Sequence, residues 1–450
     1  MPENVTTPSS VTRAGIVQLA WPIILSNISV PLLGMVDTAV IGNLGQASLI
    51  GAIAIGALIF SFLFWGFGFL RMGTTGLIAQ AAGARNLPEI RATLYRAVIV
   101  GIAIGLILIA FQTPIISVAM QWLGGSYQVE SEAANYFSIR IWSAPATLTN
   151  LVILGYFLGH QATRTTLALQ LLLNGSNIVL DIVFVSGFGW GVAGVASATL
   201  IAEYLTVLFG VYLIYQSLRT DHPIKTVSWR QLLDTHALQQ MLTVNSDIMI
   251  RTLCLIFAFA WFTNQGAQAG DILLAANAIL MQLVSFAAFF LDGFALAAES
   301  LVGYAIGKRH RIELRDSIVL STQLAVLTAI IITLLYLAIG GFVIQFLTNV
   351  ESVVQASDTF LPWVIASPIV SVWCYQLDGI FIGATRTADM RNAMLLSLMV
   401  FLLSWWPLQH YFGNHGLWCS LLLFFVVRAL TLAVKLPAIV PELWQKRPVP

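Results

Sequence analysis

Charged residues are scarce in this sequence: Asp, Glu, Lys and Arg make up only 9% of 450 residues, and the formal net charge is +1. A chain with so little charge has no basic field to attract nucleic acid, so we expect no nucleic-acid partner. Hydrophobic residues make up 58%, and the mean hydropathy is +0.86. This composition predicts an all-α polytopic membrane protein, whose surroundings are the lipid bilayer.

Reactive and metal-binding motifs are also missing. The three cysteines have no CxxC spacing, and the six histidines form no HExxH pattern. No GxxxxGK[ST] motif is present for ATP hydrolysis. We find no nucleophile paired with a base, and therefore expect neither an enzyme nor a bound organic cofactor. The polar N-terminal segment lacks the pattern of a cleavable signal peptide.

Long apolar runs are what the sequence has instead. They predict about twelve transmembrane helices, which start near residues 14, 49, 92, 134, 164, 190, 237, 271, 316, 358, 390 and 414. Loops after alternate helices hold the cations, whereas the intervening loops contain no Lys or Arg. The positive-inside rule then predicts that both termini are cytoplasmic, in the inner (plasma) membrane of the cell.

An internal repeat relates the two halves of the chain. A shift of 224 positions superposes GARNLPEIR at 83–91 on GKRHRIELR at 307–315, and Gly155 and Gly159 on Gly379 and Gly383. We therefore predict two six-helix lobes related by a pseudo-two-fold axis along the membrane normal. The predicted parts are a cytoplasmic tail (1–13), an N-lobe (14–217), a cytoplasmic linker (218–236), a C-lobe (237–437) and a cytoplasmic tail (438–450).

The repeat is asymmetric in its acids. Asp37 and Asp181 lie in apolar runs, and the residues 224 positions later are not acidic. At 1.5 Å per residue, Asp37, Asp181 and Thr199 fall at one level, roughly 10 Å below the outer surface. Asn177 lies one helical turn from Asp181. Acids inside a membrane are costly and usually functional. These oxygens could share a proton or hold Na⁺, with hydrogen-bonded packing as the alternative.

The second half has its own acids. Asp292, Glu299 and Asp378 lie nearer the cytoplasmic end, with Arg71 and Arg251 as candidate counter-charges. Asp247 and Arg251 have the i,i+4 spacing of a local ion pair. Two interpretations stay open for the three acids: structural ion pairing or inner-gate contacts, and a second cation site.

Proline supplies a candidate moving part. Pro22 and Pro31 precede Asp37 in the first predicted helix, and each removes a backbone hydrogen bond. Such a helix can straighten or bend at little cost, and protonation of Asp37 could bias that choice. A static kink is the alternative.

Several segments together resemble one known family. They are AWPIILSNISVPLLGMVDTAVIGNLG, SAPATLTNLVILGYFLG, NIVLDIVFV, LDGFALAAESLVG and LDGIFIGATRT, in this order over nearly the whole chain. They resemble the multidrug and toxic compound extrusion (MATE) family, and its DNA-damage-inducible (DinF-like) branch in particular. The resemblance implies a secondary transporter that exports amphipathic, often cationic compounds against an inward flow of H⁺ or Na⁺.

The resemblance also implies roles for particular residues. Coupling to the ion falls to Asp37, Asn177, Asp181 and Thr199. Asn150, with Asp37, becomes a substrate-contacting group, and Pro22 becomes the point at which the first helix bends. Some branches of the family place their cation acids in the second lobe, which keeps Asp378 open.

These observations predict a multidrug efflux antiporter with alternating access, in which protonation of Asp37 is coupled to bending at Pro22. We favour H⁺ over Na⁺ as the coupling ion. The alternative is a lipid-linked-precursor flippase of the same two-lobe type, which would need several cations in its central cavity. We expect small amphipathic organic substrates and a monomer.

Overall fold

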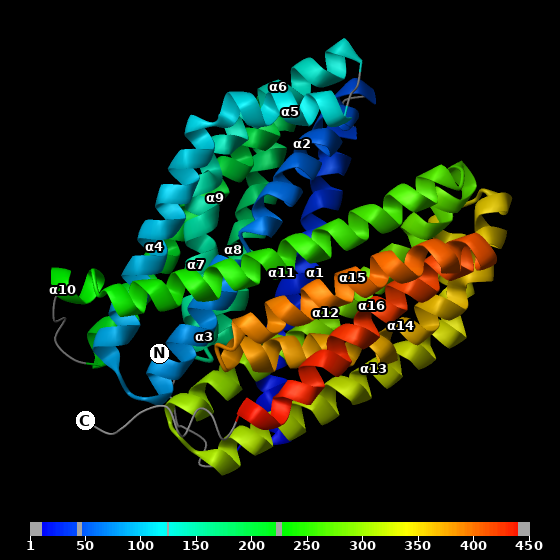
Figure 1. The fold of residues 1–450 in the computed structure, drawn as a ribbon. Coiled ribbons are helices and arrows are strands. Elements are labelled where there is room, and N and C mark those ends of the chain that lie inside the picture. The colour runs from blue at the N-terminus through cyan, green and yellow to red at the C-terminus, as the bar shows by residue number, and fades with distance from the viewer. Residues whose placement is uncertain (1–10, 43–46, 124–125, 222–226, 440–450) are drawn as a thin grey trace. The chain divides into compact units, whose positions relative to one another are not determined.

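The computed structural model describes residues 11–42, 47–123, 126–221 and 227–439, and it is helical throughout these ranges apart from the connections (Figure 1). At a few positions inside helices, Asp37 among them, only the backbone is described. Within the described ranges, twelve helical segments are long and apolar enough to cross a membrane. The predicted number of spans is confirmed.

The helices follow one another in the order of their labels in Figure 1. The α-helices are α1 (Arg13–Gly42), α2 (Ala47–Gly66), α3 (Phe69–Gly83), α4 (Leu87–Ala110), α5 (Gln112–Leu123), α6 (Tyr127–Arg140), α7 (Ala144–Gly159), α8 (Thr163–Asp181), α9 (Gly191–Asp221), α10 (Trp229–Leu232), α11 (Thr235–Gln268), α12 (Asp271–Gly307), α13 (Arg311–Leu347), α14 (Glu351–Gly383), α15 (Thr387–Phe412) and α16 (Asn414–Lys435). Short segments of other helix types are η1 (Ile141–Ser143), η2 (Ile182–Gly187) and η3 (Leu436–Ala438).

The chain forms two compact units. Unit 1 comprises Met1–Ile24, Ala79–Arg85 and Ser246–Pro450, and unit 2 comprises Leu25–Ile78 and Asn86–Asn245. Helix α1 therefore passes from unit 1 to unit 2 between Ile24 and Leu25. These units are defined by packing, and the lobe boundaries predicted from the repeat stay a prediction.

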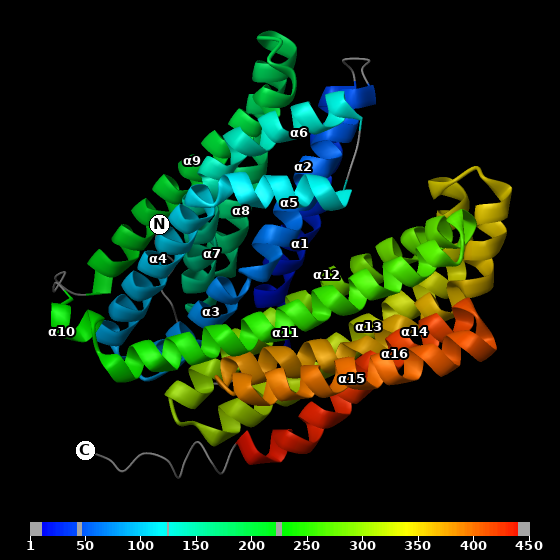
Figure 2. The same cartoon turned by 45° about the horizontal axis from the view of Figure 1, so that its top comes forward.

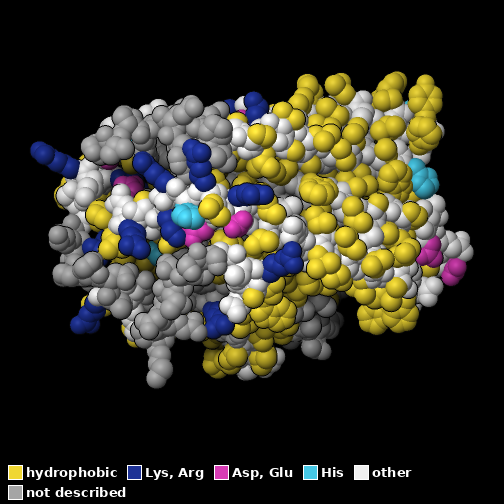
Figure 3. All heavy atoms as spheres, turned by 90° about the horizontal axis from the view of Figure 1, so that it is seen from below, with side chains coloured by type: hydrophobic (Ala, Val, Ile, Leu, Met, Phe, Trp, Pro, Cys, Tyr) yellow, Lys and Arg dark blue, Asp and Glu magenta, His cyan; other side chains and the backbone are white. Residues whose placement is uncertain are grey.

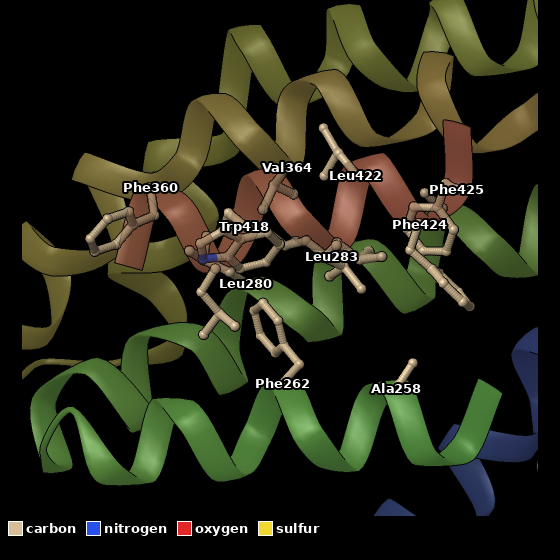
Figure 4. Packing of buried hydrophobic residues seen from close by; sticks show 14 of the residues in the cluster. Ala258, Phe262, Leu280, Leu283, Phe360, Val364, Trp418, Leu422, Phe424 and Phe425 are labelled. Atoms are coloured by element: carbon tan, nitrogen blue, oxygen red, sulfur yellow. The ribbon is translucent and has the colours of Figure 1, made fainter. Parts of the chain in front are cut away.

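Unit 1 is built on helices α12 to α16, which run side by side (Figure 2). Its core is a cluster of large apolar side chains between α11, α12, α14 and α16 (Figure 4). Phe262 and Trp418 meet edge to face, with ring centroids 4.9 Å apart. The indole Nε1 of Trp418 donates to Oδ1 of Asn277 at 2.9 Å, so this buried polar atom is satisfied inside the apolar cluster.

Unit 2 packs α4 on α7, α8 on α9, and α6 on both α2 and α9. Its helices are interrupted at several points. Helix α4 ends at Ala110 and α5 begins at Gln112, and η1 separates α6 from α7. After Asp181, α8 continues as η2, a six-residue π-helix, which is a rare form that occurs frequently at functional sites.

The internal repeat is present in the helix packing. Four repeated glycines lie where a Cβ atom would press on a backbone carbonyl of a neighbouring helix: Gly155 against Arg71, Gly159 against Thr75, Gly379 against Ala295 and Gly383 against Glu299. The contacted residues repeat as well, because Ala295 follows Arg71, and Glu299 follows Thr75, by 224 positions. Only glycine allows such close approach of two helices, so both halves need it at these positions.

The helix ends repeat as well. Among the residues that the structure describes, four non-glycine residues have a positive φ angle: Arg85 (53°), Gln161 (60°), Arg309 (56°) and Thr385 (53°). The third and fourth follow the first and second by 224 positions. Capping residues are also matched, since Asn86 accepts from the backbone N–H of Glu89, and His310 accepts from that of Glu313. The same backbone corners thus occur in both halves.

The surface fits a bilayer environment. Figure 3 shows one face, on which hydrophobic side chains form a broad continuous area, while Lys and Arg side chains gather in another part of the face. Many large apolar residues are exposed, among them Phe342, Phe346 and Leu337 of α13, at 70%, 80% and 66%. Such exposure suits lipid rather than water.

Candidate functional site

Two packed helices of unit 2 bring three of the predicted coupling residues together. Asp181 is the last residue of α8, Asn177 lies one turn before it, and Thr199 lies on α9. The side chains of Asn177 and Thr199 hydrogen-bond at 3.0 Å. Asp181 is 0% exposed, Asn177 1% and Thr199 8%. A carboxyl, an amide and a hydroxyl therefore form one buried polar cluster inside apolar helices.

The amide of Asn177 fits this cluster in two orientations. In one, its Nδ2 donates to Thr199 Oγ1 at 3.0 Å. In the other, Nδ2 donates to Oδ2 of Asp181 at 3.1 Å, and Oδ1 accepts from both the backbone N–H and the hydroxyl of Thr199 at 3.0 Å. The second suits an ionised Asp181, because a carboxylate can only accept and Oδ2 then receives a donor.

Asp37 is the fourth predicted coupling residue. Its backbone is part of α1, but its side chain lies outside the described residues. An earlier turn of α1 is held against α8, because Asn174 Nδ2 donates to the Ser29 hydroxyl at 2.8 Å. This contact fixes where α1 meets α8.

Asn150, predicted from the family resemblance to contact substrate, lies in the middle of α7 and is 6% exposed. Its Nδ2 donates to Oε2 of Glu203 at 2.6 Å and to the backbone carbonyl of the same residue at 3.0 Å. Glu203, on α9, is itself 8% exposed. The predicted substrate contact is thus bonded to a membrane-embedded acid.

Asp378, one of the three acids predicted in the second half, is held by two arginines of unit 1. Arg251 Nη1 donates to Oδ2 of Asp378 at 2.5 Å, and Arg428 Nε donates to Oδ1 at 3.3 Å. A second nitrogen of Arg428 pairs with Oδ2 of Asp378. Asp292 and Glu299 also act electrostatically on Arg251.

One predicted charge pairing is contradicted, and another is not tested. Asp247 pairs with Arg391 of α15 at 2.6 Å, and its other oxygen accepts from the Thr387 hydroxyl at 3.0 Å. The local i,i+4 pair of Asp247 with Arg251 is therefore wrong, because Arg251 turns toward α14. Arg71 belongs to unit 2, whereas the acids it was expected to balance belong to unit 1, so that pairing stays a prediction.

Pro22 is buried in α1. The helix runs from Arg13 to Gly42 without a break in its assigned residues, through both Pro22 and Pro31. The pyrrolidine ring of Pro22 removes the backbone N–H that would otherwise donate to the carbonyl of Gln18. The helix is therefore continuous but lacks one of its backbone bonds two residues before it passes between units.

Sequence reasoning missed two charged residues at these sites, Glu203 and Arg428. Each lies alone in an apolar run, IAEYLTVLF and LLLFFVVRAL, which is the same signal that identified Asp37. Among the residues that the structure describes, no three His, Cys, Asp or Glu side chains gather as a metal site would need. The predicted Na⁺ site would also use amide and hydroxyl oxygens, and includes Asp37.

Comparison with known proteins identifies the family. Residues 22–183 and 248–406 match the MatE family model. The DNA damage-inducible protein F of Escherichia coli K12 is 42% identical over 419 residues, which cover 92% of this chain and 90% of that protein.

Solved structures agree on the fold. Crystal structures of MATE in the straight and in the bent conformation match with TM-scores of 0.84 and 0.83, each at 19% identity over 96% of this chain and 97% of theirs. At that identity the likeness shows the fold alone. Together with the family model and the relative from E. coli, it confirms the resemblance: this chain belongs to the MatE family of multidrug and toxic compound extrusion transporters, membrane proteins that are coupled to cations and are not enzymes.

Proposed function

We propose that this transporter exports small amphipathic organic compounds, many of them cationic, in exchange for protons that enter through unit 2. The observation that carries the proposal is the buried cluster of Asn177, Asp181 and Thr199. A carboxyl group placed inside apolar helices is costly to the fold, and such groups usually serve transport. Protonation removes most of that cost, which gives the cluster two states of similar energy.

The register of α1 and α8 supports adding Asp37 to this cluster. Ser29 and Asn174 are in contact. Asp37 follows Ser29 by eight residues and Asp181 follows Asn174 by seven, which are rises of about 12 Å and about 10 Å. Both helices run from inside to outside in the predicted topology. The two acids then lie at one level, where their ionisation would be coupled.

The Asn177 amide is the reason to favour the proton. While Asp181 is ionised, the amide nitrogen stabilises it at 3.1 Å. Once Asp181 carries a proton it becomes a donor, and the amide can present its oxygen to Asp181 and its nitrogen to Thr199. The amide can thus offer Asp181 either a donor or an acceptor without backbone movement. Na⁺ at the same oxygens is the competing interpretation.

Bending of α1 at Pro22 would connect proton binding to substrate release. Pro22 lies fifteen residues before Asp37 and two before the point at which α1 leaves unit 1. Relatives of this fold have been crystallised in a straight and a bent conformation. We infer that protonation of Asp37 and Asp181 favours the bent state here. One charge crossing 100 mV supplies about 2.3 kcal/mol, enough for more than a tenfold substrate gradient per ion.

We assign the acids of unit 1 to structural ion pairing rather than to a second cation site. The oxygens of Asp378 accept from two guanidinium groups, which occupy the positions that Na⁺ would need. The same pairing weakens the flippase alternative, because Arg251 neutralises an acid instead of facing a pyrophosphate. We also propose that the protein is a monomer in the inner membrane, with both termini in the cytoplasm and the two lobes predicted from the repeat.

The test is transport by the purified protein in liposomes. A fluorescent cationic dye is loaded inside vesicles, and a pH gradient and a Na⁺ gradient are imposed in separate experiments. We expect dye movement to follow the pH gradient with no Na⁺ present. Dye movement that follows Na⁺ and ignores pH would replace the proton with Na⁺, and movement that follows neither would refute antiport.

A further inference from the structure

Glu203 has no role in the mechanism proposed above, although it lies near the cluster of Asn177, Asp181 and Thr199. Thr199 and Glu203 are separated by four residues on α9, so they are neighbours on the same face of the helix. Thr199 binds the Asn177–Asp181 pair, and Glu203 binds Asn150. The buried carboxyl groups of Asp181 and Glu203 are therefore both linked to the same face of α9, one through Thr199 and the other directly.

The groups that bond Glu203 are neutral. Asn150 Nδ2 donates to Oε2 at 2.6 Å, and the Thr147 hydroxyl, on the same helix α7, is also within hydrogen-bonding reach. Neutral donors offset only part of the cost of an ionised carboxylate in the membrane interior. Asp378 is different, since two arginines contact it directly.

Charged groups near Glu203 are few among the described residues. Helix α9 packs against α2, α6, α7, α8, η1 and η2. Of these, α6 contributes the Arg140 guanidinium, which acts on Glu203 electrostatically, and α8 contributes Asp181. Arg140 donates to the Tyr136 hydroxyl at 2.5 Å and lies 4.7 Å from the centre of the Phe60 ring. The remaining charges of these helices, Glu130, Glu132 and Arg164, lie in their first turns or next to them.

The acceptor side of Asn150 gives a second, independent observation. Its Oδ1 is buried, and no described residue donates a hydrogen bond to it. A buried acceptor without a donor is costly, and this one belongs to an amide whose nitrogen already binds Glu203. A proton on the Glu203 carboxyl would supply the missing donor, because a carboxylic acid has one O–H to give.

We propose that Glu203 is a second proton-binding carboxyl of unit 2. The ionised carboxylate takes up one H⁺ to become a carboxylic acid, whose O–H donates to Asn150 Oδ1, and it returns the proton when the pair reverts. Thr199 lies between this site and Asp181, so each site responds to the charge of the other. This inference rests on the proposed antiport for its meaning in the cycle, whereas proton binding itself can be measured without transport.

The experiment is infrared difference spectroscopy on the full-length protein in lipid, between alkaline and acidic buffer, with glutamate ¹³C-labelled at the side-chain carboxyl. We expect an isotope-shifted C=O band of a protonated carboxyl in acid. The band should disappear in Glu203→Gln and persist in Glu313→Gln, a control in which the lost carboxylate is paired with Lys308 at 2.8 Å. A band that survives in Glu203→Gln, or no labelled band in the parent protein, would overturn the proposal.

A second variant guards against misfolding of the first. Asn150→Leu keeps Glu203 but removes its hydrogen-bond partner, and should move the labelled band to higher frequency. An unmoved band would contradict the assigned contact. Failure of the proposed antiport would appear as absent pH-driven dye movement with the Glu203 band intact, so the two failures are distinguishable.

Discussion

Arg428 of α16 and Asp378 of α14 form a buried ion pair in which the guanidinium contacts both carboxylate oxygens. Arg428 is 2% exposed and Asp378 6%. The pair joins two helices of unit 1 through charge-assisted hydrogen bonds, and Arg251 of α11 reinforces it from a third helix. The acid is thereby balanced by the chain itself.

Removing one member of this pair should therefore be worse than removing both. We expect Arg428→Met to lower the free energy of unfolding by about 1 to 3 kcal/mol, because the buried Asp378 carboxylate keeps only Arg251 as a direct partner. Arg428→Met combined with Asp378→Asn should recover part of this loss. The measurement is thermal unfolding of detergent-purified protein, and a double variant less stable than Arg428→Met would contradict the pairing.

Asp181→Asn should abolish coupled export while leaving the fold intact. An amide fills the same space and can hydrogen-bond to Asn177, but it cannot cycle between charged and neutral forms. The measurement is pH-driven dye movement in liposomes, beside thermal stability. Asp389→Asn is the matched control, since Asp389 pairs with Arg386 at 2.7 Å at the start of α15. Near-normal transport by a stable Asp181→Asn protein would refute the site.

Pro22→Ala should slow export without removing proton binding. Alanine restores the backbone N–H that can bond to the carbonyl of Gln18, so bending α1 then breaks an additional hydrogen bond, worth about 1 kcal/mol. The check is dye transport together with the carboxyl bands of the infrared spectrum. Unchanged transport rates would favour a static kink at this proline.

Gly379→Ala should destabilise unit 1. The new Cβ would press on the carbonyl of Ala295 on α12, and the two helices would have to separate. We expect a loss of about 1 to 3 kcal/mol, as for other over-packed sites. Gly175→Ala is the control, since a Cβ at that helical position meets no atom within 4 Å, and alanine there should be neutral or stabilising. Equal stabilities of the two variants would argue against close helix contact.

The predicted topology can be tested by cysteine labelling. In a variant without the native cysteines, a cysteine at exposed Lys308 should react only when the reagent reaches the cytoplasm, and one at exposed Gln268 should react from outside. The measurement uses a membrane-impermeant maleimide on intact and on opened cells. Labelling of position 308 in intact cells would reverse the proposed orientation.

The sequence predicted features that lie along one helix better than contacts between different helices. The positions of the spans were predictable from the apolar runs, and the 224-residue repeat was predictable from glycines that recur along the chain. The Asn177–Asp181 contact was predictable because i and i+4 are neighbours on one helix. The pairs Asn150–Glu203 and Asp378–Arg428 join different helices, and their formation depends on how each helix is rotated. Asp247 makes the same point, since its partner lies on α15 rather than one turn away.

The repeated residues with positive φ angles allow the helices of the two halves to be compared over equivalent segments. As many residues separate Arg85 from Gln161 as separate Arg309 from Thr385, yet they are built differently. In the second half of the repeat, these residues form two long helices, α13 and α14. Helix α14 is continuous although it contains Pro362 and Pro368. The earlier copy divides them among α4, α5, α6, η1 and α7. Over the same number of residues, the half that carries the candidate proton sites thus has several points at which neighbouring helices could turn against each other, and the other half has only the connection between two long helices.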